Sequence, residues 1–185
     1  MTPLHLSSRE SAVIIFLLIS AGLFSRLLPH PPGATALTAV VFACSMFLGT
    51  RAALLVTAIL LMLSDALIGT YELPIMLSVY GSFSIIGLLS YWYAHSKRTL
   101  GTGVLMLCTP ALLFFLITNA AVWYFTPWYP KDLGGLLTSY TLGLPFLKNM
   151  LAGDLLYVPV VLGALALYMR TRHSFSPTLY GHEHA

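Results

Sequence analysis

The sequence predicts an all-α polytopic membrane protein with six transmembrane helices in one bundle. Of its 185 residues, 58% are hydrophobic and only 8% are charged. The mean hydropathy is +0.86, so the composition lies far from that of soluble globular domains. Basic residues are scattered singly between apolar runs and form no basic stripe, so we expect the lipid bilayer and no nucleic acid as a partner.

Six apolar stretches approach the length of about 20 residues that a helix needs to cross the hydrocarbon. They run over residues 11–28, 34–49, 52–69, 74–94, 100–125 and 150–169. The first should stop at Pro29 and the prolines after it, because proline lacks the amide donor and disfavours helix at the residue before it. Gly49 and Arg51 separate the second stretch from the third, and Pro74 opens the fourth.

These boundaries define one transmembrane domain over residues 11–169. A cytoplasmic segment, residues 1–10, precedes it, and residues 170–185 should form a disordered cytoplasmic tail. The positive-inside rule supports this orientation. Six basic residues fall on the cytoplasmic side, namely Arg9, Arg51, Lys97, Arg98, Arg170 and Arg172, against Lys131 and Lys148 outside.

The long outer connection, residues 126–149, is unusual because much of it is apolar. Glycines and Pro145 interrupt it, and a broken segment at membrane depth is tolerated only where protein buries it or it lines a cavity. We expect a lid or re-entrant element there. An interfacial helix that caps the bundle is the alternative.

Seven scarce polar side chains fall at or near the outer ends of apolar stretches. They are Arg26, His30, Asp65, Glu72, Asn119, Asn149 and Asp154. A charge inside the hydrocarbon costs several kcal/mol, so such residues are kept mainly for structural pairing or for function. Both interpretations stay open, and the functional one predicts an outward-facing ligand site.

In the functional interpretation each side chain has a stated role. Asp65 and Asp154 would orient Arg26 and accept hydrogen bonds from a substrate. Asn119 and Asn149 would donate and accept, although helix packing and an N-cap are the plainer roles for these two amides. Aromatic walls would come from Tyr80, Trp123 and Tyr140.

The imidazole of His30, held between prolines, could ligate a metal, although most loop histidines are simply solvated. We expect no resident cofactor. Phosphate-binding loops, zinc-protease patterns and nucleophile elbows are absent from the sequence, so we do not expect an enzyme.

One combination of motifs extends over most of the chain: Arg26, Pro29–Pro32, Ser64–Asp65, Asn119, Trp123, Tyr129–Pro130, Gly135–Leu136, Tyr140, Pro145–Phe146, Asn149 and Gly153–Asp154. This combination resembles a family of small prokaryotic membrane proteins of unknown function, for which a transport role has been suggested. That family in turn resembles the substrate-binding S-components of energy-coupling factor transporters. The resemblance implies a six-helix protein of a prokaryotic inner membrane that captures a vitamin, a vitamin precursor or a similar solute from outside. Cobalamin is one such solute.

We therefore expect a membrane transport protein of the S-component type, acting alone or with an energising transmembrane subunit and its ATPases. Its partners would be a small-molecule substrate and the bilayer. Two rivals remain open. The chain would be a membrane scaffold or assembly factor if the polar cluster were only an ion-pair network, and an enzyme acting on a lipid if His30 and the carboxylates did acid and base work.

Overall fold

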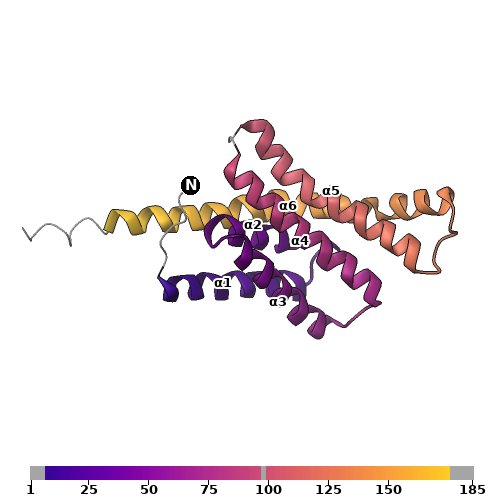
Figure 1. Ribbon diagram of the computed structural model, residues 1–185, viewed down its shortest axis with the longest axis horizontal. Helices are drawn as coiled ribbons and strands as arrows, with labels where there is room; N and C mark the ends of the chain where they lie inside the picture. Colours follow the sequence, from indigo (N-terminus) through magenta and orange to yellow (C-terminus); the bar gives the residue numbers. More distant parts are fainter. Residues whose placement is uncertain (1–6, 97–98, 176–185) are drawn as a thin grey trace, which may run out of the picture.

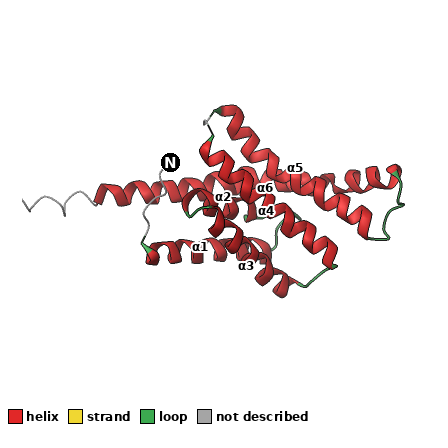
Figure 2. Cartoon of the chain, viewed as in Figure 1, coloured by secondary structure: helices red, strands yellow, loops and turns green. Residues whose placement is uncertain are grey.

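The chain folds into a bundle of α-helices, seen in a computed structural model that describes residues 7–96 and 99–175 (Figure 1). Within that part there are no strands (Figure 2). The helices are α1 (Ser8–Leu27), α2 (Leu37–Phe47), α3 (Thr50–Ile68), α4 (Leu73–His95), α5 (Leu100–Phe125) and α6 (Leu133–Phe175). The predicted all-α bundle is therefore confirmed. Residues 1–6, Lys97, Arg98 and residues 176–185 lie outside the described part.

Five of these helices are long and apolar enough to cross a membrane, and α2 is not. With 11 residues, α2 is about 16 Å long at a rise of 1.5 Å per residue. The second transmembrane span expected over residues 34–49 is therefore wrong in length, because the helix there covers only Leu37–Phe47. Nine residues of α2 are buried, so protein rather than lipid surrounds it, and a buried segment need not match the bilayer thickness.

The largest departure from the sequence prediction is α6, which runs unbroken for 43 residues. It is about 64 Å long, roughly twice the hydrocarbon thickness. Residues 133–149, expected as a broken lid, form its first half and pack along α5 in an antiparallel hairpin. The same helix also includes the first residues of the expected disordered tail, up to Phe175.

Local chemistry explains the ends of most helices. A capping box at Ser7 and Glu10 starts α1. Gly49 and Gly69, with φ of 93° and 119°, flank α3 in a backbone region that side chains with a Cβ disfavour. Asp132 accepts a hydrogen bond from the backbone amide of Gly135 at 2.8 Å, which satisfies one of the orphan donors at the start of α6.

The core lies around α2, which contacts α1, α3, α4 and α6. Phe42, Leu60, Leu61 and Ile86 are among the largest fully buried side chains. On α1, Gly22 lets the helix approach α3, because a Cβ there would overlap the side chain of Leu60. The outer faces expose many large apolar side chains, as expected of helices that face lipid.

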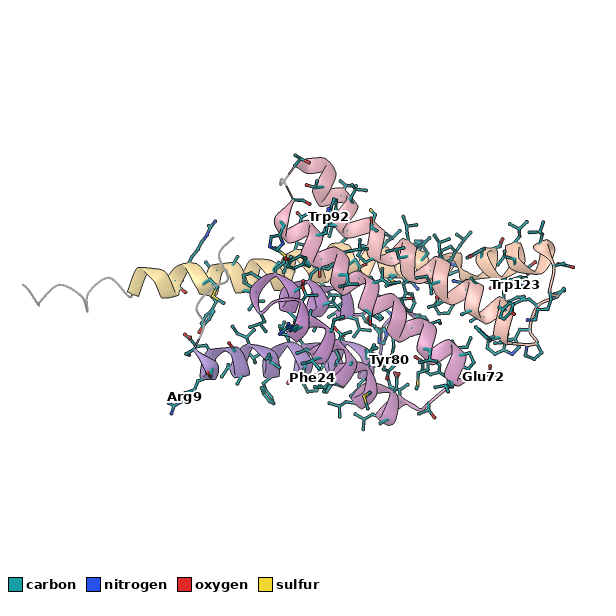
Figure 3. The ribbon with its side chains drawn as sticks, in the orientation of Figure 1. Arg9, Phe24, Glu72, Tyr80, Trp92 and Trp123 are labelled. Atoms are coloured by element: carbon teal, nitrogen blue, oxygen red, sulfur yellow. The ribbon has the colours of Figure 1, made fainter. Side chains whose placement is uncertain are left out.

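Figure 1 shows that α6 extends along the whole length of the molecule, and that the α5–α6 hairpin projects beyond the other helices. The start of α1 and the end of α6 lie toward the same end of the bundle. Arg9 lies near that end, whereas Glu72 and Trp123 lie toward the opposite one (Figure 3). The short α2 therefore returns the chain through the protein interior between α1 and α3.

Candidate ligand-binding cavity

Arg26 on α1 forms an ion pair with Asp65 on α3. Its Nη2 atom lies 2.8 Å from Oδ1 of Asp65, and its Nη1 atom donates to the hydroxyl of Ser64 at 2.6 Å. The other oxygen of Asp65 accepts hydrogen bonds from Tyr80 at 3.2 Å and, more weakly, from Tyr71 at 3.4 Å. We call these five residues the arginine network.

The arginine network leaves Asp65 little room for a further partner. The side chain of Asp65 is only 4% exposed and that of Arg26 is 16% exposed, and neither oxygen of Asp65 lacks a partner. Burial, and then the negative charge of Asp65, raises the pKa of Tyr71 to about 12, because ionisation would add a second negative charge beside the carboxylate. Asp65 therefore retains little hydrogen-bonding capacity for a ligand.

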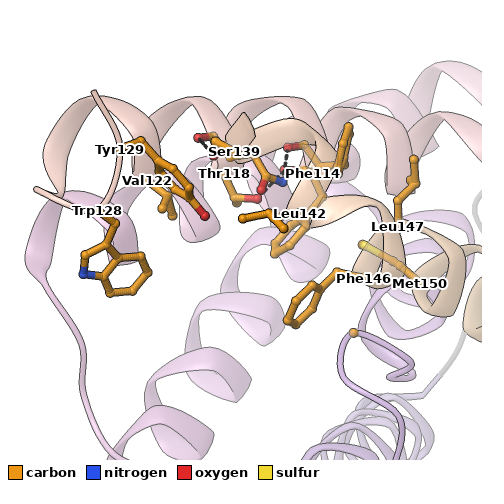
Figure 4. Close-up of a pocket in the computed structure, with 14 residues that line it drawn as sticks. Phe114, Thr118, Val122, Trp128, Tyr129, Ser139, Leu142, Phe146, Leu147 and Met150 are labelled. Atoms are coloured by element: carbon orange, nitrogen blue, oxygen red, sulfur yellow. Dashed lines mark hydrogen bonds between the residues drawn. The ribbon is translucent and has the colours of Figure 1, made fainter. Parts of the chain in front are cut away.

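A cavity of about 270 Å³ lies elsewhere, between the carboxy-terminal half of α5, the amino-terminal part of α6 and the connections that follow α1 and α5. Its lining consists of Gly33, Phe114, Phe115, Thr118, Asn119, Val122, Trp128, Tyr129, Ser139, Leu142, Gly143, Phe146, Leu147 and Met150. Figure 4 shows Trp128 and Tyr129 at one end and Leu147 and Met150 at the other. No residue of this lining carries a charge, so the cavity differs in chemistry from the arginine network.

Polar groups in the cavity are few, and most are already engaged. The hydroxyl of Thr118 donates to the carbonyl of Phe114 at 2.7 Å, and that of Ser139 donates to the carbonyl of Asn119 at 3.0 Å. The side-chain amide of Asn119 donates to the carbonyl of Phe115 at 2.8 Å. This bond leaves Oδ1 of Asn119 as a hydrogen-bond acceptor in the cavity wall.

Small residues bring α6 close to α5 at this point. Gly135, Ser139 and Gly143 are spaced four residues apart and are all buried, so they lie on one face of the helix. A Cβ on Gly143 would overlap the side chain of Asn119, and one on Gly135 would overlap the carbonyl of Pro130. The close packing of the helix at this point explains why small residues recur every four positions along this face.

The connection between α5 and α6 is short and well anchored. The indole of Trp123 donates to the carbonyl of Pro130 at 2.8 Å, and the ammonium of Lys131 donates to the carbonyls of Trp123 and Thr126. A cation at this position also favours the negative end of the α5 dipole. Residues 126–149, where a lid or re-entrant element was expected, therefore form a braced loop, residues 126–132, and the first part of α6.

The structure separates the residues that the sequence grouped into one site. Arg26, Asp65 and Tyr80 meet in the arginine network, and Asn119 lies in the cavity wall. Trp123 braces the loop, as described above. The hydroxyl of Tyr140 donates to the carbonyl of Leu116 at 3.1 Å, and its ring packs on Phe115 at a centroid distance of 5.5 Å.

The remaining candidates have structural partners or lie apart from the cavity. Asn149 is not an N-cap, because it lies within α6, where it donates to the carbonyl of Pro32 at 3.0 Å. A ring nitrogen of His30 lies 2.7 Å from the carbonyl of Leu28, and the described residues contain no cluster of three or more metal-ligating side chains. Glu72 precedes α4 as its N-cap residue, and Asp154 is buried in α6 outside the cavity lining.

Most of the cavity wall escaped the sequence analysis. Phe114 and Phe115 are ordinary members of an apolar run, and nothing in their local sequence distinguishes them from residues that face lipid. Tyr129 and Phe146 were noted only as part of the family resemblance, and Trp128 was not chosen. One signal was present. The spacing of Gly135, Ser139 and Gly143 is a small-residue stripe, typical of a continuous helix packed closely on another.

One comparison with known proteins gives a match. The model of a family described as a family of unknown function (DUF6580) matches residues 6–178. No curated protein and no solved structure matches the chain.

Proposed function

The chain belongs to this family of unknown function, and from its geometry we propose that it captures a small uncharged solute at the outer side of a prokaryotic inner membrane, as a transport protein of the S-component type. The solute would enter the cavity between α5 and α6. Both termini would lie in the cytoplasm, in keeping with the positive-inside count. An energising transmembrane subunit with ATPases, or no further subunit, would complete the transport system.

The observation that carries this proposal is the cavity itself. Ligand sites are typically concave and mostly apolar, with a few well-placed polar groups that orient the ligand. The cavity has aromatic walls from Phe114, Phe115 and Phe146, an acceptor at Asn119 and the hydroxyl of Tyr129. This arrangement suits an uncharged, ring-bearing molecule that donates a hydrogen bond to the amide oxygen.

The size of the cavity limits the ligand further. An apolar cavity of roughly 150 Å³ accepts one benzene ring, so about 270 Å³ has room for about two fused rings. A molecule as large as cobalamin would not fit without displacing wall residues. A small vitamin or precursor with an uncharged ring system fits better.

A matched pair of glycine variants tests the proposal. Gly143→Ala would push the side chain of Asn119 out of place, whereas Gly163→Ala on the same helix meets open space. The wild type and Gly163→Ala, purified gently from native membranes, should release the same small molecule on denaturation, measured by mass spectrometry. Gly143→Ala should retain about tenfold less, because losing a hydrogen bond and the surrounding fit costs at least about 1.4 kcal/mol.

Two results would contradict this proposal. If no variant releases a molecule, and no compound in a panel of uncharged one-ring and two-ring compounds raises the thermal midpoint of the wild type, the proposal fails. Equal retention by Gly143→Ala and Gly163→Ala would place the ligand elsewhere.

One observation favours a second candidate, a non-transporting membrane scaffold or assembly factor. The arginine network is fully paired and joins α1, α3 and α4, as expected of a structural element. In a scaffold the cavity would be a packing defect. The empty-cavity result described above is the outcome that this candidate predicts.

A further inference from the structure

Asp154 differs from every other carboxylate in the described part of the chain. It lies on α6, is only 1% exposed, and its Oδ2 atom has no hydrogen-bond partner. The two other buried side-chain oxygens without a partner belong to Thr50 and Thr57, which do not ionise. Thr38, at the start of α2, is a neighbour of Asp154 whose hydroxyl can donate to the carboxyl group.

Within residues 7–96 and 99–175, no lysine or arginine forms an ion pair with Asp154. The helices packed against α6 are α2 and α5, and neither contains Lys, Arg, His, Asp or Glu. Their titratable groups are Cys44 on α2 and Cys108 and Tyr124 on α5. On α6 itself, Tyr157 carries no positive charge, and Lys148, six residues before Asp154, is exposed.

The nearby connection between α1 and α2 offers no counter-charge either. Its one titratable residue, His30, already has a ring nitrogen 2.7 Å from the carbonyl of Leu28. Arg26, at the end of α1, is engaged by Ser64 and Asp65. A buried carboxylate without a partner costs several kcal/mol, so the ionised form is poorly accommodated.

Two features at the amino-terminal end of α2 favour a negative charge here, the hydroxyl of Thr38 and the start of the helix. Its N-cap residue, Ala36, provides no side-chain cap, and the dipole at a helix start attracts anions. However, the unpaired Oδ2 atom of Asp154 shows that the free amides of this turn do not bind that oxygen. The dipole alone, worth about 0.3–1 kcal/mol at exposed sites and up to about 2 in partly buried ones, does not offset the burial of a charge.

We propose that Asp154 is a proton-binding site: its carboxylate takes up one proton and is held in the bundle as a neutral carboxylic acid. The binding reaction is the addition of one proton to one carboxylate oxygen, so no other reactant is needed. The site lies close to the cavity. Met150, one turn before Asp154, lines the cavity, and the adjacent Gly153 packs against Ala34, where a Cβ would lie 3.0 Å from the Ala34 Cα.

Proton binding at this position has a structural route to the cavity. Gly33 is part of the cavity wall, and a Cβ on it would lie 3.2 Å from the carbonyl oxygen of Phe146. Residues 33–38 therefore contact the cavity at one end and Asp154, through Thr38, at the other. Loss of the proton would leave a negative charge against this segment and move it, which would couple proton binding to the shape of the cavity.

Infrared spectroscopy of the purified protein in lipid tests the proposal without any ligand. A buried carboxylic acid gives a C=O stretching band that an ionised carboxylate lacks, and the band shifts on exchange into deuterated water. We expect the wild type to show this band and Asp154→Asn, which has nearly the same shape, to lose it. Asp132→Asn, which removes an exposed carboxylate from the start of the same helix, should keep it.

A second variant guards against a failure of Asp154→Asn to fold. Thr38→Val retains the carboxyl group but removes its hydrogen-bonding neighbour, so the band should remain and shift in frequency. A wild type without the band, or a band that persists in folded Asp154→Asn, would overturn the proposal. So would stabilisation of the wild type by sodium or potassium ions that Asp154→Asn abolishes, because a metal ion would then occupy the site. None of these outcomes depends on whether the cavity binds a solute.

Discussion

Two buried carboxylates in this bundle have opposite surroundings. Asp65 has an arginine, held at 2.8 Å, and two tyrosine hydroxyls, whereas one oxygen of Asp154 has no partner. In the sequence both residues lie about four positions inside an expected helix end, which made them look equivalent. The comparison shows that similar depth does not imply a similar role, because the partners on neighbouring helices decide whether a charge is paired.

The largest expected effect comes from breaking the arginine network. Asp65→Ala leaves Arg26 largely buried without its counter-ion, and breaking one side of a buried pair costs about 3 kcal/mol. Denaturant titration in detergent micelles should show this loss in the free energy of unfolding. The double variant Arg26→Met with Asp65→Leu should recover most of the loss, because two apolar side chains leave no uncompensated charge.

This prediction also tests whether the two regions really differ. If Asp65→Ala folded with unchanged stability and instead lost the molecule released from the wild type, the arginine network would be part of the ligand site. The proposed difference between Asp65, a paired structural carboxylate, and Asp154, an unpaired functional one, would then be wrong.

A smaller effect is expected from the packing beside Asp154. A Cβ on Gly153 would lie 3.0 Å from the backbone of Ala34, and backbone cannot move aside as a side chain can. Gly153→Ala should therefore lower the thermal midpoint, with a cost of about 1–3 kcal/mol. Gly163→Ala on the same helix meets open space and should be neutral or slightly stabilising, since alanine favours helix over glycine. Equal midpoints for the two variants would mean that α6 is not packed tightly against residues 34–36.

The smallest effect is a pH dependence in the arginine network. The pKa of Tyr71 is raised from 10.0 to about 12 in the folded protein, so the folded state holds this proton more tightly than the unfolded state does. The resulting stability is complete below pH 10 and is lost as the pH rises toward 12. Tyr71→Phe should flatten the fall of the unfolding midpoint over this interval.

The control for this titration is Tyr124→Phe, which removes an exposed phenol outside the arginine network. It should leave the pH dependence as it is in the wild type. A Tyr71→Phe profile that matches the wild type would show that the tyrosine does not sense Asp65.

The sequence predicted the helical bundle well because its evidence is local. Apolar runs, prolines and turn glycines act on the residues next to them, and they located α1, α3, α4 and α5 to within a few residues. The prediction failed at α2 and α6, where the deciding contacts are distant. Burial by neighbouring helices allows α2 to be short, and packing on α5 keeps α6 helical through Gly143 and Pro145.

The candidate site was predicted only in part, for a related reason. The pairing of Arg26 with Asp65 was one of those expected, because a buried arginine needs a nearby carboxylate. Tyr80 was expected as an aromatic wall and instead donates to Asp65, and a ligand role for these residues stays a prediction. Asn119 was chosen for its polarity, but its aromatic neighbours were not, because an apolar residue in a span can face lipid, core or cavity. Only the crossing of α5 over α6 distinguishes these three environments.

By itself, the sequence determined that this chain is a helical membrane protein and which of its side chains are too polar to be left without a partner in lipid. Composition and hydropathy suffice for that, because transfer of each side chain from water depends mainly on its own chemistry. The tertiary structure alone decided which polar groups are paired, where the cavity lies and that one oxygen of Asp154 has no partner. These properties depend on distances between residues far apart in the chain, which follow from how the helices pack.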